Sequence, residues 1–157
     1  MTQDEMIALA KQAAARHGLA PEIVCAVCEQ ESSWNPWAIR YEPAFRQRYV
    51  APLGLPPTEE IARSMSWGLM QVMGETAREA GFGEKFLSAL ADPATGLEFG
   101  CIVLAGKFRH AALTLAESGA SAALAPHELV RSGLELWNGG ANPDYAAQAL
   151  SRADKFR

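Results

Sequence analysis

The stretch PEIVCAVCEQES, residues 21–32, decides the fold. A proline followed by an acidic residue is typical of a helix start, and apolar side chains then recur at helical spacing through Val24 and Cys28. Glu31 follows Val24 by seven positions and Cys28 by three, so it falls on the same stripe. The pattern predicts a buried helix that carries one carboxylate at the end of its apolar face.

Signals for further helices lie on both sides of this stretch. Thr2 and Glu5 have the spacing of a capping box, and Gly18 is a typical helix end. Asp92 and Asn142 each precede a proline, an arrangement that favours a helix start. Beyond residue 32, the expected helices cover residues 44–49, a stretch from Glu59 capped by Thr58, and residues 75–80, 84–91, 93–118 (ended by Gly119), 126–137 and 143–156.

No apolar alternation is long enough to predict a strand, so the fold class that we expect is all-α. Neither a repeat nor a long linker divides the chain, which predicts a single domain over residues 1–157. Residues 1–20 would form an N-terminal helix and residues 21–157 the core. The irregular segment 40–57 is expected as an insertion or lid that borders a functional site and moves on binding.

Composition narrows the classes of partner. The 157 residues are 49% hydrophobic with a formal net charge of −4, which argues against nucleic acid as a partner. The longest apolar stretches fall short of the roughly 20 residues that span a bilayer, so we expect no membrane insertion. The start, MTQDEMIALAKQ, lacks the pattern of a secretory signal, which predicts synthesis in the cytoplasm. We expect a monomer.

The cysteines and histidines predict neither a disulfide framework nor a metal site. Cys25 and Cys28 have redox-motif spacing, but they stand in an apolar helical run with no strand pattern before it. With Cys101, the third cysteine, they are better explained as buried thiols. The three histidines are widely separated, so we expect no metal and no cofactor.

Glu31 is the candidate for acid–base chemistry. A carboxyl group in an apolar wall resists ionisation, which raises its pKa and allows it to donate a proton near neutral pH. The spacing alone also fits a boundary residue that is exposed in the last helical turn or bonded to Ser32. Periodicity by itself therefore leaves both interpretations open.

Four motifs in order carry more information: Gln30-Glu31-Ser32-Ser33, the run GLMQVM at residues 68–73, WNGG at residues 137–140, and Tyr145. Over about residues 21–156 they resemble the soluble lytic transglycosylases, relatives of goose-type lysozyme. The resemblance implies a lysozyme-like helical domain with a glycan cleft, Glu31 as the catalytic acid and Tyr145 as its support. The positions that it implies for substrate binding are Ser32, Gly68, Met70, Gln71, Met73, Trp137, Asn138 and Gly139.

The chain departs from the family pattern in two places. Trp137 stands where the family usually has tyrosine, which puts a phenol contact there in doubt. The connection between Glu31 and residue 68 is longer than in the soluble bacterial enzymes, and goose-type lysozymes enlarge the same region with acids that position water. Glu42 is therefore a candidate second carboxylate. Glu59 and Glu60 are better explained by the electrostatics of a helix N-terminus.

The resemblance implies a lytic transglycosylase that cleaves the β-1,4 bond between N-acetylmuramic acid and N-acetylglucosamine in peptidoglycan glycan strands. Glu31 would act as acid and then base, giving 1,6-anhydro-muramyl products without a cofactor. One alternative is hydrolysis with water, as in goose-type lysozyme; another is a non-catalytic wall-binding or structural module. A small domain without targeting signals is similar to phage or prophage endolysins, which reach the cell wall through a membrane lesion.

Overall fold

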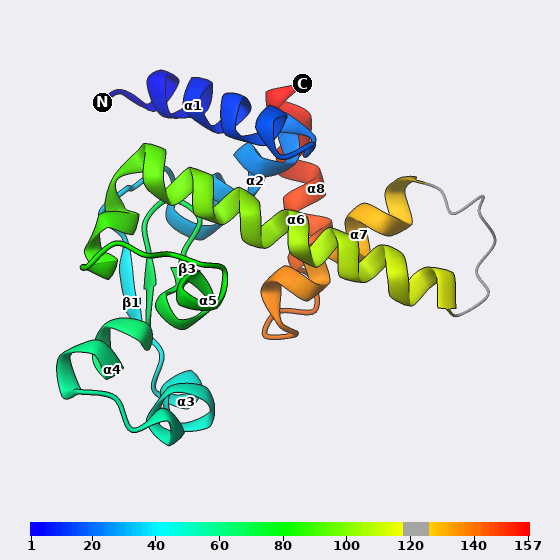
Figure 1. Ribbon diagram of the computed structural model, residues 1–157. Helices are drawn as coiled ribbons and strands as arrows, with labels where there is room; N and C mark the ends of the chain where they lie inside the picture. The colour runs from blue at the N-terminus through cyan, green and yellow to red at the C-terminus, as the bar shows by residue number, and fades with distance from the viewer. Residues whose placement is uncertain (118–125) are drawn as a thin grey trace.

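The computed structural model of the chain describes residues 1–117 and 126–157. Helix α2 (Pro21–Ser32) packs between helices α1 (Gln3–Arg16) and α8 (Tyr145–Ala153) (Figure 1). All side chains from Ile23 to Cys28 are buried, which confirms the predicted apolar helix. Immediately after it, Ser33 and Trp34 adopt positive φ angles of 50° and 64° and turn the chain away. The helix therefore ends one residue after Glu31.

Helix α1 (Gln3–Arg16) begins with the predicted capping box. The Thr2 hydroxyl accepts a hydrogen bond from the Glu5 amide at 3.2 Å, and the Glu5 carboxylate accepts one from the Thr2 amide at 2.7 Å. These two bonds satisfy amides that have no partner within the helix. The buried residues of α1 are mostly alanine (Ala10, Ala13 and Ala14), and the helix packs against α2 and α6.

Three longer elements form the C-terminal half: α6 (Pro93–Glu117), α7 (Pro126–Asn138) and α8 (Tyr145–Ala153), followed by the 3₁₀-helix η4 (Asp154–Phe156). Figure 1 shows α7 beside the distal half of α6, where Gly133 leaves room for the Phe108 ring. Asp92 caps α6 by accepting a hydrogen bond from the Thr95 amide, as predicted. The predicted helix end at residues 118 and 119 lies outside the described residues.

One expectation about these helices needs correction. Helix α8 begins at Tyr145 rather than at residue 143, because the Asn142 side chain accepts the Asp144 amide and forms a turn there. By length and composition alone, α6 is apolar enough to cross a membrane, whereas no such segment was expected. One such helix is weak evidence for a membrane span. In this structure 28% of its apolar window is buried, and α6 packs against α1, α5 (Gly74–Glu79) and α7.

A small antiparallel sheet was not predicted. Strands β1 (Ile39–Tyr41), β2 (Met65–Trp67) and β3 (Val72–Met73) pair in the order β1-β2-β3, with Ile39 opposite Trp67. Runs of two or three residues are too short for alternation to be visible in a sequence. The fold is nevertheless mostly α, in agreement with the predicted class, and the strands connect the helical core to the segment that follows β1.

The segment between β1 and β2 contains four short helices and lies apart from the helical body (Figure 1). They are α3 (Pro43–Phe45), the π-helix η1 (Arg46–Val50), the 3₁₀-helix η2 (Ala51–Leu53) and α4 (Pro57–Arg63). The expected helix over residues 44–49 is thus split between α3 and η1. Thr58 does not cap α4, because the helix already begins at Pro57, where a fixed φ suits the first helical position.

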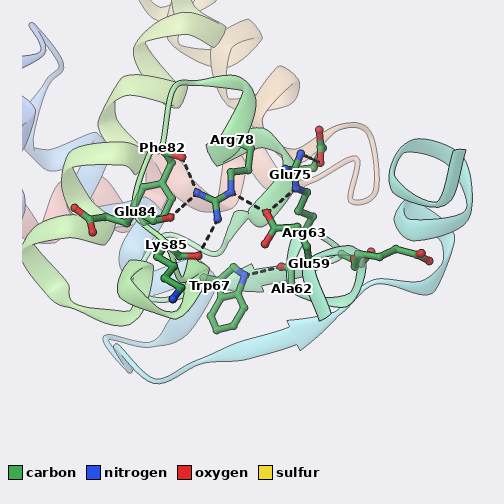
Figure 2. A network of polar contacts seen from close by, with 11 residues as sticks. Glu59, Ala62, Arg63, Trp67, Glu75, Arg78, Phe82, Glu84 and Lys85 are labelled. Carbon is green, nitrogen blue, oxygen red and sulfur yellow. Dashed lines mark hydrogen bonds and ion pairs between the residues drawn. The ribbon is translucent and has the colours of Figure 1, made fainter. Parts of the chain in front are cut away.

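A network of ion pairs and hydrogen bonds fixes α4 to α5 (Gly74–Glu79) (Figure 2). Glu59 accepts hydrogen bonds from Arg63 at 2.8 Å and from Arg78 at 3.0 Å, and Arg63 also reaches the buried Glu75 at 3.2 Å. Arg78 further donates to the backbone carbonyls of residues 82, 84 and 85. These carbonyls are bonded to a side chain instead of to helix amides. The expected helix 84–91 is accordingly reduced to the 3₁₀-helix η3 (Leu87–Ala91).

The three cysteines lie in the helical core. Cys25, Cys28 and Cys101 are fully buried and free. Burial raises the pKa of the Cys25 thiol to about 11 and that of Cys101 to about 12. Because the thiolate is the reactive form, these thiols are unreactive at neutral pH, in agreement with the packing role expected from the sequence.

Candidate active site

A cleft of about 690 Å³ runs along the junction between the helical body and the segment after β1. Its wall combines residues from α2, α6, α7 and α8 with residues from the strands and from α3 and η1. The lining residues include Glu31, Arg40, Glu42, Phe45, Tyr49, Gln71, Met73, Lys107, Trp137, Asn138, Gly139 and Tyr145. Most of the residues named from the sequence therefore meet at one place.

Glu31 reaches this cleft from the last turn of α2. Its Oε1 atom accepts a hydrogen bond of 2.6 Å from the Tyr145 hydroxyl and one of 3.1 Å from the Trp137 indole N–H. No described residue donates to its Oε2 atom. One oxygen is thus held by the protein while the other is left for a ligand.

Burial raises the pKa of Glu31 above its ordinary value, because desolvation disfavours the carboxylate. The hydrogen bonds from Tyr145 and Trp137 and the positive charge of Arg40 act in the opposite direction but do not cancel the effect. Burial also raises the pKa of Tyr145 well above its usual value, so its hydroxyl stays a donor. This arrangement suits a group that gives up a proton near neutral pH.

The two donors to Glu31 come from α7 and α8, more than 100 positions along the chain. The resemblance predicted the contact of Tyr145. It did not predict that Trp137, in place of the usual tyrosine, donates its N–H to the same oxygen. An indole N–H offers one donor and no acceptor, so Trp137 can bond only to the acceptor oxygen of Glu31.

Gln71 is held in a strained conformation with a positive φ of 49°. Its amide donates to the carbonyls of Ala38 at 2.9 Å and Gly68 at 3.1 Å, and its oxygen accepts the Ser66 hydroxyl at 2.7 Å. Both polar atoms of the Gln71 side chain thus have hydrogen-bond partners within the protein. Gln71 and Met73 line the cleft, as the resemblance implied, and Gln71 also fixes the β2–β3 turn.

Three expected substrate contacts take packing positions instead and are absent from the cleft wall. The Ser32 hydroxyl donates to the carbonyls of Cys28 at 3.0 Å and Leu69 at 2.8 Å. Met70 is fully buried. Gly68 has a positive φ, and a β-carbon there would overlap the carbonyl oxygen of residue 90. The glycine is thus required by close approach to backbone rather than to a ligand.

The end of α7 contributes Asn138 and Gly139 to the cleft, as the resemblance implied. The Asn138 amide donates to the Asn142 carbonyl at 2.9 Å and closes the loop between α7 and α8. Gly139 follows with a positive φ of 66°, a conformation typical of the residue after a helix. These residues place the start of α8, and hence Tyr145, beside Glu31.

Of the three other carboxylates considered, only Glu42 lines the cleft, where it forms an ion pair with Arg40. Glu59 belongs to the network described above; burial opposes its ionisation, but hydrogen bonds from Arg63 and Arg78 hold its pKa below the ordinary value. Glu60 is bonded to Arg46 at 2.7 Å. Both lie in the first turn of α4, as the helix electrostatics predicted.

Some cleft residues were not predicted from the sequence, among them Arg40, Phe45, Tyr49 and Lys107. Isolated charged and aromatic residues in an irregular segment give no periodic signal. Phe45 and Tyr49 reach the cleft through the path of the chain between β1 and β2, whereas Arg40 lies in β1 and Lys107 in α6. Within residues 1–117 and 126–157, no group of three or more His, Cys, Asp or Glu side chains could hold a metal ion.

The sequence model of the transglycosylase SLT domain matches residues 8–119, which include Glu31 and the stretch 68–73. No match was found among curated proteins, and none among solved structures. Residues 8–119 form more than half of the chain, so the match indicates a peptidoglycan-acting function of the lytic transglycosylase type. On this match and on the helical fold around Glu31, the chain belongs to the transglycosylase SLT domain family.

Proposed function

We propose that this protein cleaves the β-1,4 bond between N-acetylmuramic acid and N-acetylglucosamine, with Glu31 as acid and then base. The observation that carries the proposal is the state of Glu31: a half-buried carboxyl in the cleft, with a raised pKa and one oxygen held by Tyr145 and Trp137. In the first step protonated Glu31 gives its proton to the glycosidic oxygen as the bond to the muramyl C1 atom breaks.

In the second step the substrate's own N-acetyl group stabilises the positive charge at C1. Glu31, now a carboxylate, takes the proton of the muramyl C6 hydroxyl, and this oxygen forms the new bond to C1. The 1,6-anhydro ring closes without water, and Glu31 returns to its protonated form. Intramolecular attack needs no second carboxylate, because the nucleophile is already held next to C1.

Hydrolysis with water is the second candidate, and Glu42 is the observation that favours it. Glu42 lines the same cleft as Glu31 and forms an ion pair with Arg40. Inverting enzymes use a second carboxylate to activate water. A non-catalytic wall-binding module is less well supported, because binding alone gives no reason to hold an acid by two donors in a cleft.

The deciding experiment is mass spectrometry of the soluble fragments after purified protein digests peptidoglycan, with Glu31→Gln as the control. Transglycosylation predicts anhydro-muramyl ends, one water lighter than reducing ends. Reducing-end products that disappear in Glu42→Gln would establish a lysozyme instead. Products in equal amounts from Glu31→Gln would contradict both reactions at this site.

The proposal extends to a biological setting, that of a phage or prophage endolysin made in the cytoplasm and released onto the wall. Cells that express the protein alone should then keep their turbidity. Cells that co-express a membrane-permeabilising protein should lyse. Lysis without any membrane lesion would contradict this setting while leaving the reaction untouched.

A further inference from the structure

We propose that Phe45 and Tyr49 form an additional sugar-binding platform at the insertion side of the cleft, which binds an N-acetylated sugar ring of a long glycan strand. The inference rests on the proposed function, because it takes a glycan as the ligand of the cleft. It assigns a binding role to two residues that neither the sequence motifs nor the chemistry at Glu31 uses.

The two rings lie together on the cleft wall. Phe45 and Tyr49 are one helical turn apart, with ring centroids 4.9 Å apart and planes inclined by 47°. Phe45 is half-buried, whereas Tyr49 is 49% exposed and its ring is accessible from the cleft. Aromatic faces of this kind suit the apolar faces of sugar rings, and the phenol offers a hydrogen-bonding group at the edge.

The platform is held in place from behind. Arg46, which follows Phe45 in the sequence, donates to Glu60 of α4 at 2.7 Å, and Val50, at the end of η1, is fully buried. The Arg48 guanidinium lies 5.1 Å from the centre of the Tyr49 ring. Helix α4 is in turn fixed to α5 by the network in Figure 2. The rings are thus presented on an anchored support, which lowers the conformational entropy that the protein loses when a ligand binds.

Polar groups suited to a sugar line the same cleft as the rings. Arg40 and Glu42, which form an ion pair with each other, line this cleft. Their side chains supply donors and acceptors for the hydroxyl and acetamido groups of a sugar. Two other aromatic residues are more exposed, Trp37 at 74% and Phe86 at 64%, but neither lines the cleft. The platform is distinguished by its position and not by exposure alone.

The test measures binding of N-acetylglucosamine oligomers from dimer to hexamer by calorimetry, in the Glu31→Gln background so that no oligomer is cleaved. The hexamer should bind more tightly than the dimer. In Tyr49→Leu this advantage should fall by about tenfold, the loss of one aromatic contact. Phe45→Leu should reduce it less. Phe86→Leu is the matched control and should keep the full advantage.

Thermal melts of each variant guard against misfolding. An unchanged hexamer-to-dimer ratio in folded Tyr49→Leu, or a parent protein that binds both oligomers equally, would overturn the platform. The outcome is separable from the proposed function. Anhydro products without length dependence would refute the platform alone, whereas length-dependent binding without cleavage would refute the reaction alone.

Discussion

The wall that carries Glu31 and the wall formed by residues 43–63 face the same cleft but are held together by different forces. The first belongs to a core in which α2 buries six consecutive side chains and α7 and α8 each send a donor to Glu31. In α3, η1, η2 and α4 only Val50 is buried, and ion pairs such as Arg46–Glu60 supply the attachment. Apolar packing therefore positions the proposed catalytic residues, whereas ion pairs position the residues proposed to bind the sugar.

The largest expected effect tests the packed wall. Glu31→Gln keeps the shape of the side chain but removes its proton transfer, so the rate of glycan cleavage should fall on the order of 10³-fold. Glu29→Gln is the matched control on the same helix, since Glu29 lies outside the cleft and pairs with Lys155. Fragment release measured by chromatography should separate the two. A Glu31→Gln enzyme with a tenth of the parent rate would contradict the assignment.

Two glycines with the same backbone conformation compare the walls directly. Gly68 and Gly54 have φ angles of 69° and 64°, but a β-carbon at residue 68 would overlap backbone, whereas one at residue 54 would meet nothing within 4 Å. Gly68→Ala should therefore lower the free energy of unfolding by about 3 kcal/mol and Gly54→Ala by about 1 kcal/mol. Urea unfolding measures both. Equal losses would mean that the insertion is as tightly packed as the core.

Removing one donor to Glu31 should change the pH profile. Tyr145→Phe loses a hydrogen bond that lowers the pKa of Glu31, so this pKa should rise further. Because the acid must be protonated, the alkaline limb of kcat/KM should move to higher pH, while the maximum falls about tenfold from poorer positioning. Tyr41→Phe, outside the cleft, is the control. A limb that moves to lower pH would contradict the role of Tyr145.

The smallest effect concerns stability. Since the pKa of Glu31 is raised in the folded protein, the folded state binds its proton more tightly than the unfolded chain does. Stability from this group is present below the ordinary glutamate pKa and is lost as the pH rises through the folded pKa. Glu31→Gln should therefore gain in stability relative to the parent between pH 4 and neutrality. A difference that stays constant with pH, in urea melts, would contradict the raised pKa.

Local signals in the sequence predicted the helices well and the sheet not at all. The cap at Thr2 and the stripe from Val24 to Glu31 depend on residues a few positions apart, and both were correct. The strands contain two or three residues and exist only because distant segments meet, as Ile39 does with Trp67. The periodicity of apolar residues along the sequence carries no information about such a pairing.

The site residues, too, include contacts that could be predicted from the sequence and contacts that could not. The contact of Tyr145 with Glu31 was predicted only through the resemblance, because no local pattern links residues 114 positions apart. Ser32, for which the resemblance implied a substrate contact, donates to the Leu69 carbonyl and is absent from the cleft wall. Motif letters do not distinguish a residue that faces the cleft from one that supports the wall from behind. Phe45 and Tyr49 of the segment 40–57 line the cleft, while the movement of this segment on binding stays a prediction.

The unequal treatment of the two oxygens of Glu31 has a consequence for repeated turnover. Tyr145 and Trp137 both donate to Oε1, so in the proposed reaction the transferable hydrogen leaves from Oε2 and another returns to it. The hydrogen taken from one muramyl C6 hydroxyl is then the one delivered to the next leaving group. Each cleavage would prime its successor, and the carboxyl would have no need to exchange with solvent or to rotate between cycles.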